Sequence, residues 1–118
     1  MDIRDSELSY LGYDKSDSYG VVWKVGGSST NGLFDEVNVH GDVSNSRFHD
    51  NYIGAYTVGA HGMQWLTNEL YLNVQEGLDL QSDSDSLVLQ GNSFQHNGSH
   101  GLLASARCDH LSITGNRS

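Results

Sequence analysis

The chain has 118 residues, a formal net charge of −9, 14 glycines, no proline and one cysteine. The acidic balance argues against nucleic acid and anionic membrane surfaces as partners, because binding to phosphates requires a basic surface. No apolar run approaches the roughly 20 residues of a membrane span, and a single cysteine excludes an internal disulfide.

A strand-like pattern begins at the N-terminus, without a signal-peptide pattern, and recurs along the chain. Five segments start with an apolar residue that is followed by mostly polar positions. They begin at Ile3, Val43, Trp65, Leu89 and Ile113. The last three intervals between these positions are nearly equal, whereas the first is almost twice as long. All of them fall within the range of roughly 20–50 residues that is typical of repeat proteins.

Glycines followed by mostly apolar residues form a second landmark in each repeat. They lie at Gly20, Gly54, Gly77 and Gly101. Each repeat is therefore expected to contain two short strands with glycine- and asparagine-rich corners between them. One repeat is too thin to bury its own apolar side chains, but repeats stacked about 4.8 Å apart bury a continuous column. Helices are disfavoured because no long stretch keeps a 3.6-residue period.

The pattern predicts an all-β fold, a right-handed parallel β-helix (solenoid) of about five coils of 22–24 residues. Residues 1–118 are expected to be a single β-helix fragment, because both ends fall within a repeat. Residues 26–41 are interpreted as a long loop insertion in the first coil, with an added strand between Phe34 and Val39, and residues 42–118 as regular coils. Open strand edges favour self-association through the solenoid ends.

The spacing also predicts which residues stack on neighbouring coils. Two apolar columns are expected, one formed by the five segment starts and one by Leu8, Phe48, Leu70 and Phe94. A third position holds Asn68, Asn92 and Asn116, which suits a ladder of side-chain amides. The alternative is a simple preference of asparagine for turns.

Two stretches resemble a known family. Residues 73–85 read Asn-Val-Gln-Glu-Gly-Leu-Asp-Leu-Gln-Ser-Asp-Ser-Asp, and residues 96–108 read His-Asn-Gly-Ser-His-Gly-Leu-Leu-Ala-Ser-Ala-Arg-Cys. On these motifs the region 42–118 is similar to the mannuronan (alginate) C5-epimerases, which are parallel β-helix proteins. The resemblance implies a polyuronate polysaccharide as the partner, and a parent family that is periplasmic or secreted.

The family's Asp-Pro-His-Asp motif is only partly present. Asp79 occupies the position of the first aspartate, whereas Leu80, Gln81 and Ser82 replace the proline, the histidine and the second aspartate. Glu76 stands where the family has a tyrosine. The histidine and the tyrosine are the family's proton-transfer candidates, so the resemblance implies a polysaccharide-directed module whose catalytic activity is weak or lost.

Epimerisation next to a carboxylate needs a base, an acid and a group that neutralises the carboxylate. The candidate catalytic residues are Asp79, His100, Arg107 and His61. The candidate substrate-binding residues are Lys24, Tyr56 and Gln81, on one outward face with Asp79 and Arg107. Arg107 occupies the same repeat position as Asp83, and His100 the same as Glu76, so an ion pair and a carboxylate–imidazole contact are expected between adjacent coils.

No cofactor or metal is predicted, with calcium at Asp79, Asp83 and Asp85 as the alternative. Two further functions stay open. One is an active uronan epimerase or lyase that uses His100 or His61 with Arg107. The other is a purely structural or engineered solenoid that self-assembles and binds no ligand.

Overall fold

The computed structural model describes residues 1–14, 19–24, 39–105 and 107–117. Within these residues the regular structure consists of thirteen short β-strands. No helix in this part of the chain is long and apolar enough to cross a membrane.

The strands form three sheets. Sheet A contains β1 (Ile3–Arg4), β4 (Val43–Ser44), β7 (Gln64–Leu66), β10 (Val88–Gln90) and β13 (Ser112–Thr114). Sheet B contains β2 (Glu7–Ser9), β5 (Arg47–His49), β8 (Glu69–Tyr71) and β11 (Ser93–Gln95). Sheet C contains β3 (Val21–Lys24), β6 (Ala55–Val58), β9 (Leu78–Gln81) and β12 (Leu102–Ala104).

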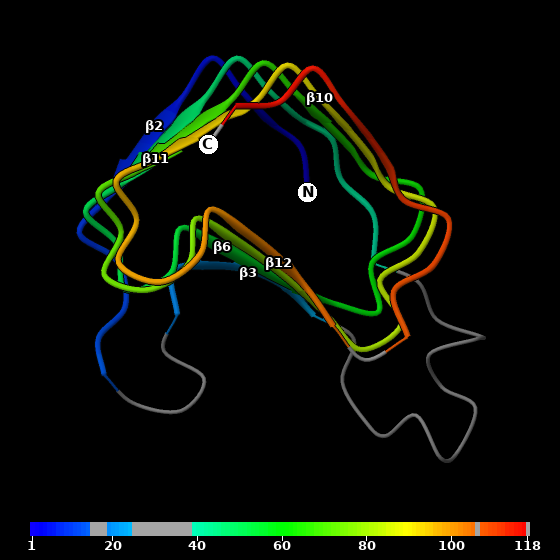
Figure 1. Cartoon of the computed structure of the whole chain (residues 1–118), viewed down its shortest axis with the longest axis horizontal. Coiled ribbons are helices and arrows are strands. Elements are labelled where there is room, and N and C mark those ends of the chain that lie inside the picture. Colours follow the sequence, from blue (N-terminus) through cyan, green and yellow to red (C-terminus); the bar gives the residue numbers. More distant parts are fainter. Residues whose placement is uncertain (15–18, 25–38, 106, 118) are drawn as a thin grey trace.

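The chain visits sheets A, B and C in turn and then returns to sheet A one layer further along (Figure 1). Four such coils are present, and β13 begins a fifth. Every strand pairing is parallel, and neighbouring strands of a sheet belong to successive coils. This topology confirms the predicted parallel β-helix, in which each coil pairs its backbone with the next.

Each coil contains three strands rather than the two predicted from the sequence. The segment interpreted as one strand is bent where the chain passes from sheet A to sheet B. In every coil the bend includes a residue with positive φ. These residues are Asp5, Asn45, Thr67, Gly91 and Gly115. A left-handed backbone conformation turns the chain sharply, so the strands on both sides of the bend can face the same core.

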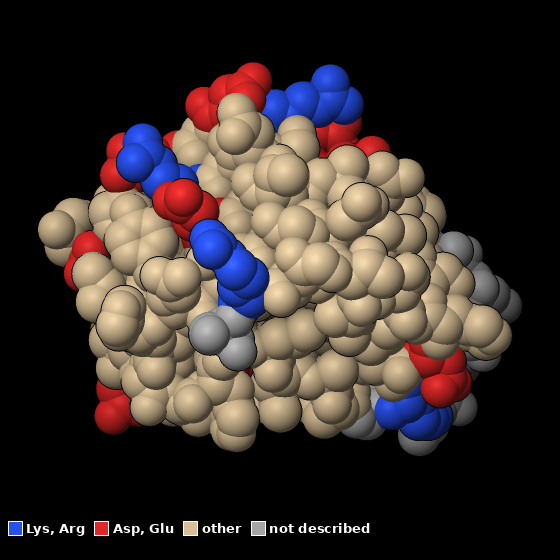
Figure 2. Space-filling view, turned by 45° about the horizontal axis from the view of Figure 1, so that its top comes forward, with Lys and Arg blue, Asp and Glu red and all other residues tan. Residues whose placement is uncertain are grey.

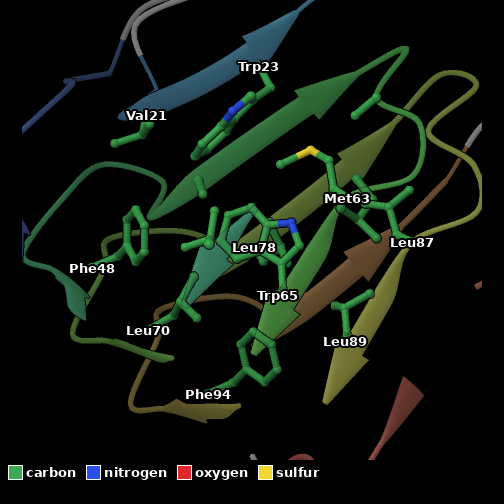
Figure 3. Close-up of a cluster of buried hydrophobic side chains, with 14 residues drawn as sticks. Val21, Trp23, Phe48, Met63, Trp65, Leu70, Leu78, Leu87, Leu89 and Phe94 are labelled. Carbon is green, nitrogen blue, oxygen red and sulfur yellow. The ribbon is translucent and has the colours of Figure 1, made fainter. Parts of the chain in front are cut away.

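The core follows the predicted columns. Sheet A stacks Ile3, Val43, Trp65, Leu89 and Ile113, and sheet B stacks Leu8, Phe48, Leu70 and Phe94. Trp23 of sheet C and Trp65 of sheet A, from different coils, meet inside the solenoid with ring centroids 5.4 Å apart in an edge-on arrangement (Figure 3). Large apolar side chains from all three sheets thus fill one continuous core, which supplies the main stabilisation.

Two asparagine ladders line the corners of the coils. The predicted ladder is present, because Asn68 Nδ2 donates to Asn92 Oδ1 at 3.0 Å and Asn92 Nδ2 donates to Asn116 Oδ1 at 2.9 Å. The sequence analysis missed a second ladder, in which Asn73 Nδ2 donates to Asn97 Oδ1 at 2.9 Å. The same amides also donate to backbone carbonyls, so the ladders satisfy polar groups that the corners bury.

Most of the predicted insertion at 26–41, including the added strand up to residue 38, lies outside the described residues. Val39 is described and forms a parallel bridge with Ala60, and Gly41 is buried against the first coil. A second insertion, between β2 and β3, was not predicted. Eleven residues separate β2 from β3, whereas five separate β5 from β6. The long first repeat therefore has extra residues in two connections.

Candidate functional site

The outer face of sheet C carries the predicted substrate-binding residues. Because side chains alternate along a strand, Asp79 and Gln81 point outward from β9 while their neighbours point into the core. The register places Tyr56 next to Asp79, and it places Lys24 in the same row as Gln81, with Val58 between them. The structure thus brings four predicted residues to one face, and their roles stay predictions.

Asp79 is enclosed although it lies on the outer face, with 5% of its surface exposed. Gln81 Nε2 donates a hydrogen bond to Asp79 Oδ1 at 2.8 Å. Burial raises the pKa of Asp79, and the bond from Gln81 opposes this shift only in part. The Gln81 amide does not titrate, so it orients the carboxyl group without exchanging a proton with it.

The other predicted catalytic residues lie at opposite ends of sheet C. His100 precedes β12 and contacts Glu76, with Nδ1 and Oε1 3.6 Å apart. Arg107 follows β12 and pairs with Asp83, with Nη2 and Oδ2 2.8 Å apart. Both predicted contacts are therefore confirmed. His61 follows β6 and lies at the same end as Arg107. The length of a strand, roughly 10 Å, separates His100 from the other two.

Four further tyrosines, not predicted from the sequence, adjoin the predicted Tyr56 on this face. Tyr19 stacks on Tyr56 with ring centroids 4.4 Å apart. At the corner between sheets B and C, Tyr10, Tyr13 and Tyr52 line an open cavity of about 410 Å³. Tyr10 is 80% exposed and Tyr13 is 61% exposed. These five residues are called the tyrosine surface below, and they are five of the six tyrosines in the chain.

Tyr52 connects the two parts of the tyrosine surface. Its hydroxyl donates a hydrogen bond to Asp14 Oδ1 at 3.1 Å. Partial desolvation raises the pKa of Tyr52 most strongly, and the hydrogen bond with Asp14 raises it further. Glu76 and Tyr19 lie near enough to add to the same shift. The corner cavity and the outer face of sheet C therefore form one region with exposed rings and polar atoms.

The model of one protein family, described as periplasmic copper-binding protein (NosD), matches residues 3–118. The chain belongs to the NosD family. Comparisons with curated proteins and with solved structures found no match. The NosD match covers every strand described above and supports the β-helix, but it gives no support to the narrower resemblance to mannuronan C5-epimerases. The family's periplasmic description agrees with the compartment expected for the parent family.

The side chains of this NosD-family chain do not fit the copper of the family's description. Copper sites are built mainly from imidazole, thiolate and thioether groups. All six histidines, both methionines and Cys108 are among the described residues. No group of three or more His, Cys, Asp or Glu side chains in those ranges is arranged to hold a metal. Met63 is fully buried, and burial raises the pKa of Cys108, which disfavours the thiolate.

The alternative calcium site at Asp79, Asp83 and Asp85 is likewise not assembled in the described ranges. Asp83 is paired with Arg107, and Asp85 Oδ1 accepts the backbone N–H of Asp109 at 2.6 Å. Both carboxyl groups are therefore engaged by groups of the following coil.

The sequence contains one feature that could have indicated the tyrosine surface. All five of its residues occur within the first 56 positions of this NosD-family chain. Three of them, Tyr10, Tyr13 and Tyr19, belong to the first coil, whose length departs from the repeat, so spacing did not place them beside Tyr52 and Tyr56.

Proposed function

We propose that this NosD-family chain is a polysaccharide-binding module that carries out no turnover. The observation that supports this function is the tyrosine surface, which continues onto the face that holds Asp79 and Gln81. The chain would act by holding a glycan along the corner between sheets B and C.

The tyrosine surface has the chemistry that sugar rings require. A pyranose has apolar C–H faces and a rim of hydroxyls, so it packs on an aromatic ring and bonds to nearby polar atoms. Tyr10 and Tyr13 offer exposed rings at the corner. Gln81, which is half-buried and hydrogen-bonded to Asp79, offers polar atoms on the same face as Tyr56. A linear polymer is long enough to contact both parts at once.

The charges around this surface favour a neutral polymer. Asp14, Glu76 and Asp79 place carboxyl groups along it. Arg107, the predicted partner of a uronate, is already paired with Asp83. A polyuronate would meet like charges unless salt or a cation screened them. The polyuronate expected from the epimerase resemblance is therefore the second ligand to compare.

The absence of turnover is proposed from the separation of the titratable groups. His100 lies at one end of sheet C, whereas His61 and Arg107 lie at the other end. Gln81 cannot act as an acid or a base. His100, which lies near enough to lower the pKa of Asp79, is therefore separated from Arg107, the group that would neutralise the substrate carboxylate in both epimerisation and elimination.

Affinity electrophoresis in gels that contain a β-glucan, a galactomannan or polymannuronate tests the binding. We expect the chain to be retarded by a neutral polymer, and Tyr10→Ala and Tyr13→Ala to reduce this retardation. Both side chains are exposed, so the variants should fold normally. Tyr71→Ala is the matched control, because Tyr71 is the tyrosine outside the tyrosine surface.

Migration that is unchanged in all three polymers would contradict the proposal. Retardation of the Tyr10→Ala and Tyr13→Ala variants that equals that of the unsubstituted chain would also contradict it. Turnover is tested separately by proton NMR of polymannuronate incubated with the chain. New guluronate signals would establish an epimerase and unsaturated ends a lyase, and either result would overturn the proposed lack of activity.

A further inference from the structure

The outer face of sheet B carries a column of residues with alternating charge. The register stacks Glu7, Arg47, Glu69 and Ser93, and a parallel bridge adds Arg117 beyond Ser93. Figure 2 shows acidic and basic side chains alternating in a short row on this side of the molecule. Ser93 interrupts the alternation, so the column has one uncharged residue between Glu69 and Arg117.

This interruption leaves two opposite charges unpaired. Arg47 lies 3.9 Å from Glu7, but neither Glu69 nor Arg117 forms an ion pair with any other residue in the described ranges. Two coil spacings put the backbones of Glu69 and Arg117 roughly 10 Å apart. Both side chains are exposed and remain available to a ligand.

Between these two charges lies a pocket of about 260 Å³, lined by Glu69, Tyr71, Ser93, Gln95 and Arg117. Tyr71 forms an apolar wall. One face of its ring stacks on His49 of the preceding coil, with centroids 4.9 Å apart and 10° between the planes. The opposite face points toward the following coil, where the register places Gln95.

We propose that this pocket binds a small zwitterion of the amino-acid type. The ligand's carboxylate bonds the guanidinium of Arg117, and its ammonium group bonds the carboxylate of Glu69. Charge-assisted hydrogen bonds are about 2.8 Å long, so the ligand lies directly between the charged ends of the two side chains. The methylene groups between those charges pack on Tyr71, and Gln95 and Ser93 bond the remaining carboxylate oxygen.

A ligand with a single charge satisfies only half of the pocket. An anion alone would leave Glu69 unpaired and would be repelled by a chain of net charge −9. A cation alone would leave Arg117 unpaired. Binding of both charged ends of the ligand is therefore the source of selectivity against singly charged ligands. This inference does not depend on the proposed binding of polysaccharide at the tyrosine surface.

The test is an NMR titration of the ¹⁵N-labelled chain with glycine, β-alanine and γ-aminobutyrate. The side-chain amide of Gln95 and the Nε–H of Arg117 are the local reporters. We expect both signals to shift in a saturable way. Glu69→Gln and Arg117→Gln should each weaken binding at least about tenfold, because each removes one charge-assisted contact. Arg4→Gln is the matched control, since Arg4 is an exposed arginine on sheet A.

Acetate and methylammonium, added separately at the same ionic strength, complete the experiment. If either one shifts the same signals with the same affinity, the pocket is a single-charge site and the proposal is wrong. Unshifted signals with all three amino acids overturn it too, as does undiminished binding by the Glu69 or Arg117 variant. The circular dichroism spectrum of each variant verifies that it is folded.

Discussion

The imidazole of His49 has a carboxylate on each of its ring nitrogens. Nδ1 lies 2.7 Å from Asp50 Oδ2, and Nε2 lies 2.5 Å from Glu7 Oε1. The bond with Asp50 raises the pKa of His49 most strongly, burial opposes it, and Glu7 raises the pKa further. Because Glu7 belongs to β2 and His49 to β5, the protonated ring joins the first coil to the second.

This arrangement predicts that the chain loses stability as the solution becomes more alkaline. The pKa of His49 is higher in the folded chain than the ordinary value of 6.5. Its contribution is therefore complete below the pKa of the unfolded chain and is lost as the pH rises through the folded-state pKa. Urea unfolding at pH 6 and pH 8 measures this difference. His49→Gln should reduce the dependence, whereas His96→Gln, at an exposed position, should keep it.

An identical pH dependence in the wild type and the His49→Gln variant would mean that the two carboxylates do not stabilise the protonated ring. Arg47 also pairs with Glu7, so Glu7→Gln would disturb two contacts and is the less informative variant.

At the level of the strands, glycines set how closely the coils approach one another before sheet C. A Cβ atom on Gly54 would lie 2.3 Å from the carbonyl oxygen of Gly77, and one on Gly77 would lie 2.6 Å from that of Gly101. Real side chains do not tolerate such distances. The glycine landmark in the sequence therefore marks the place where successive backbones pass in direct contact, and this contact explains its recurrence just before β6, β9 and β12.

The asparagine ladder makes a testable contribution at a corner between sheets A and B. Asn68 is 1% exposed; its Oδ1 accepts the backbone N–H of Ser46 at 3.0 Å, and its Nδ2 donates to the carbonyl of Val43 at 2.9 Å. Asn68→Ala would leave both backbone groups buried without partners. We expect the free energy of unfolding, measured in urea, to fall by about 2–4 kcal/mol.

Gln64→Ala is the control for this measurement, because Gln64 lies on β7 with an exposed side chain and its truncation should change stability by less than about 0.5 kcal/mol. Equal effects of the two substitutions would mean that water or a shifted backbone replaces the ladder contacts at low cost.

Across the whole molecule, the repeat spacing of the sequence predicted the features that depend on the stacking of one coil on the next. The columns through Trp65 and Leu89 and the ladder through Asn68 and Asn92 follow from a repeat of nearly constant length, because each coil must present the same residue to the next. The third strand of each coil was missed because β7 and β8 are separated by only two residues, so the bend is not visible in the apolar pattern.

The candidate site was less predictable, because outward-facing residues need not repeat. The register did place Tyr56 beside Asp79 and Arg107 beside Asp83. It did not show that His100 lies at the opposite end of the strands from Arg107, since that depends on where each strand begins and ends. Tyr10 and its neighbours come from connections of the irregular first coil, which carry no period.

The end of the stack at β13 has a measurable consequence for association. In the described residues, β13 pairs with β10 on one side and with no strand on the other, and Ile113 at its centre is 48% exposed. A free strand edge is a template for pairing with another chain. We expect the 118-residue chain to associate end to end as its concentration rises, which sedimentation velocity would reveal as growth of a dimer boundary.

Ile113→Lys should weaken this association, because a charge at the centre of the edge strand opposes stacking of a second apolar layer. Val74→Lys is the matched control, since Val74 is 59% exposed but follows β8 on the side of the stack rather than at its end. A monomer boundary at the highest concentration reached would show that the exposed edge of β13 does not recruit a second copy. Loss of the dimer in both variants would instead point to association through the side of the solenoid, where Val74 and the tyrosine surface share one cavity.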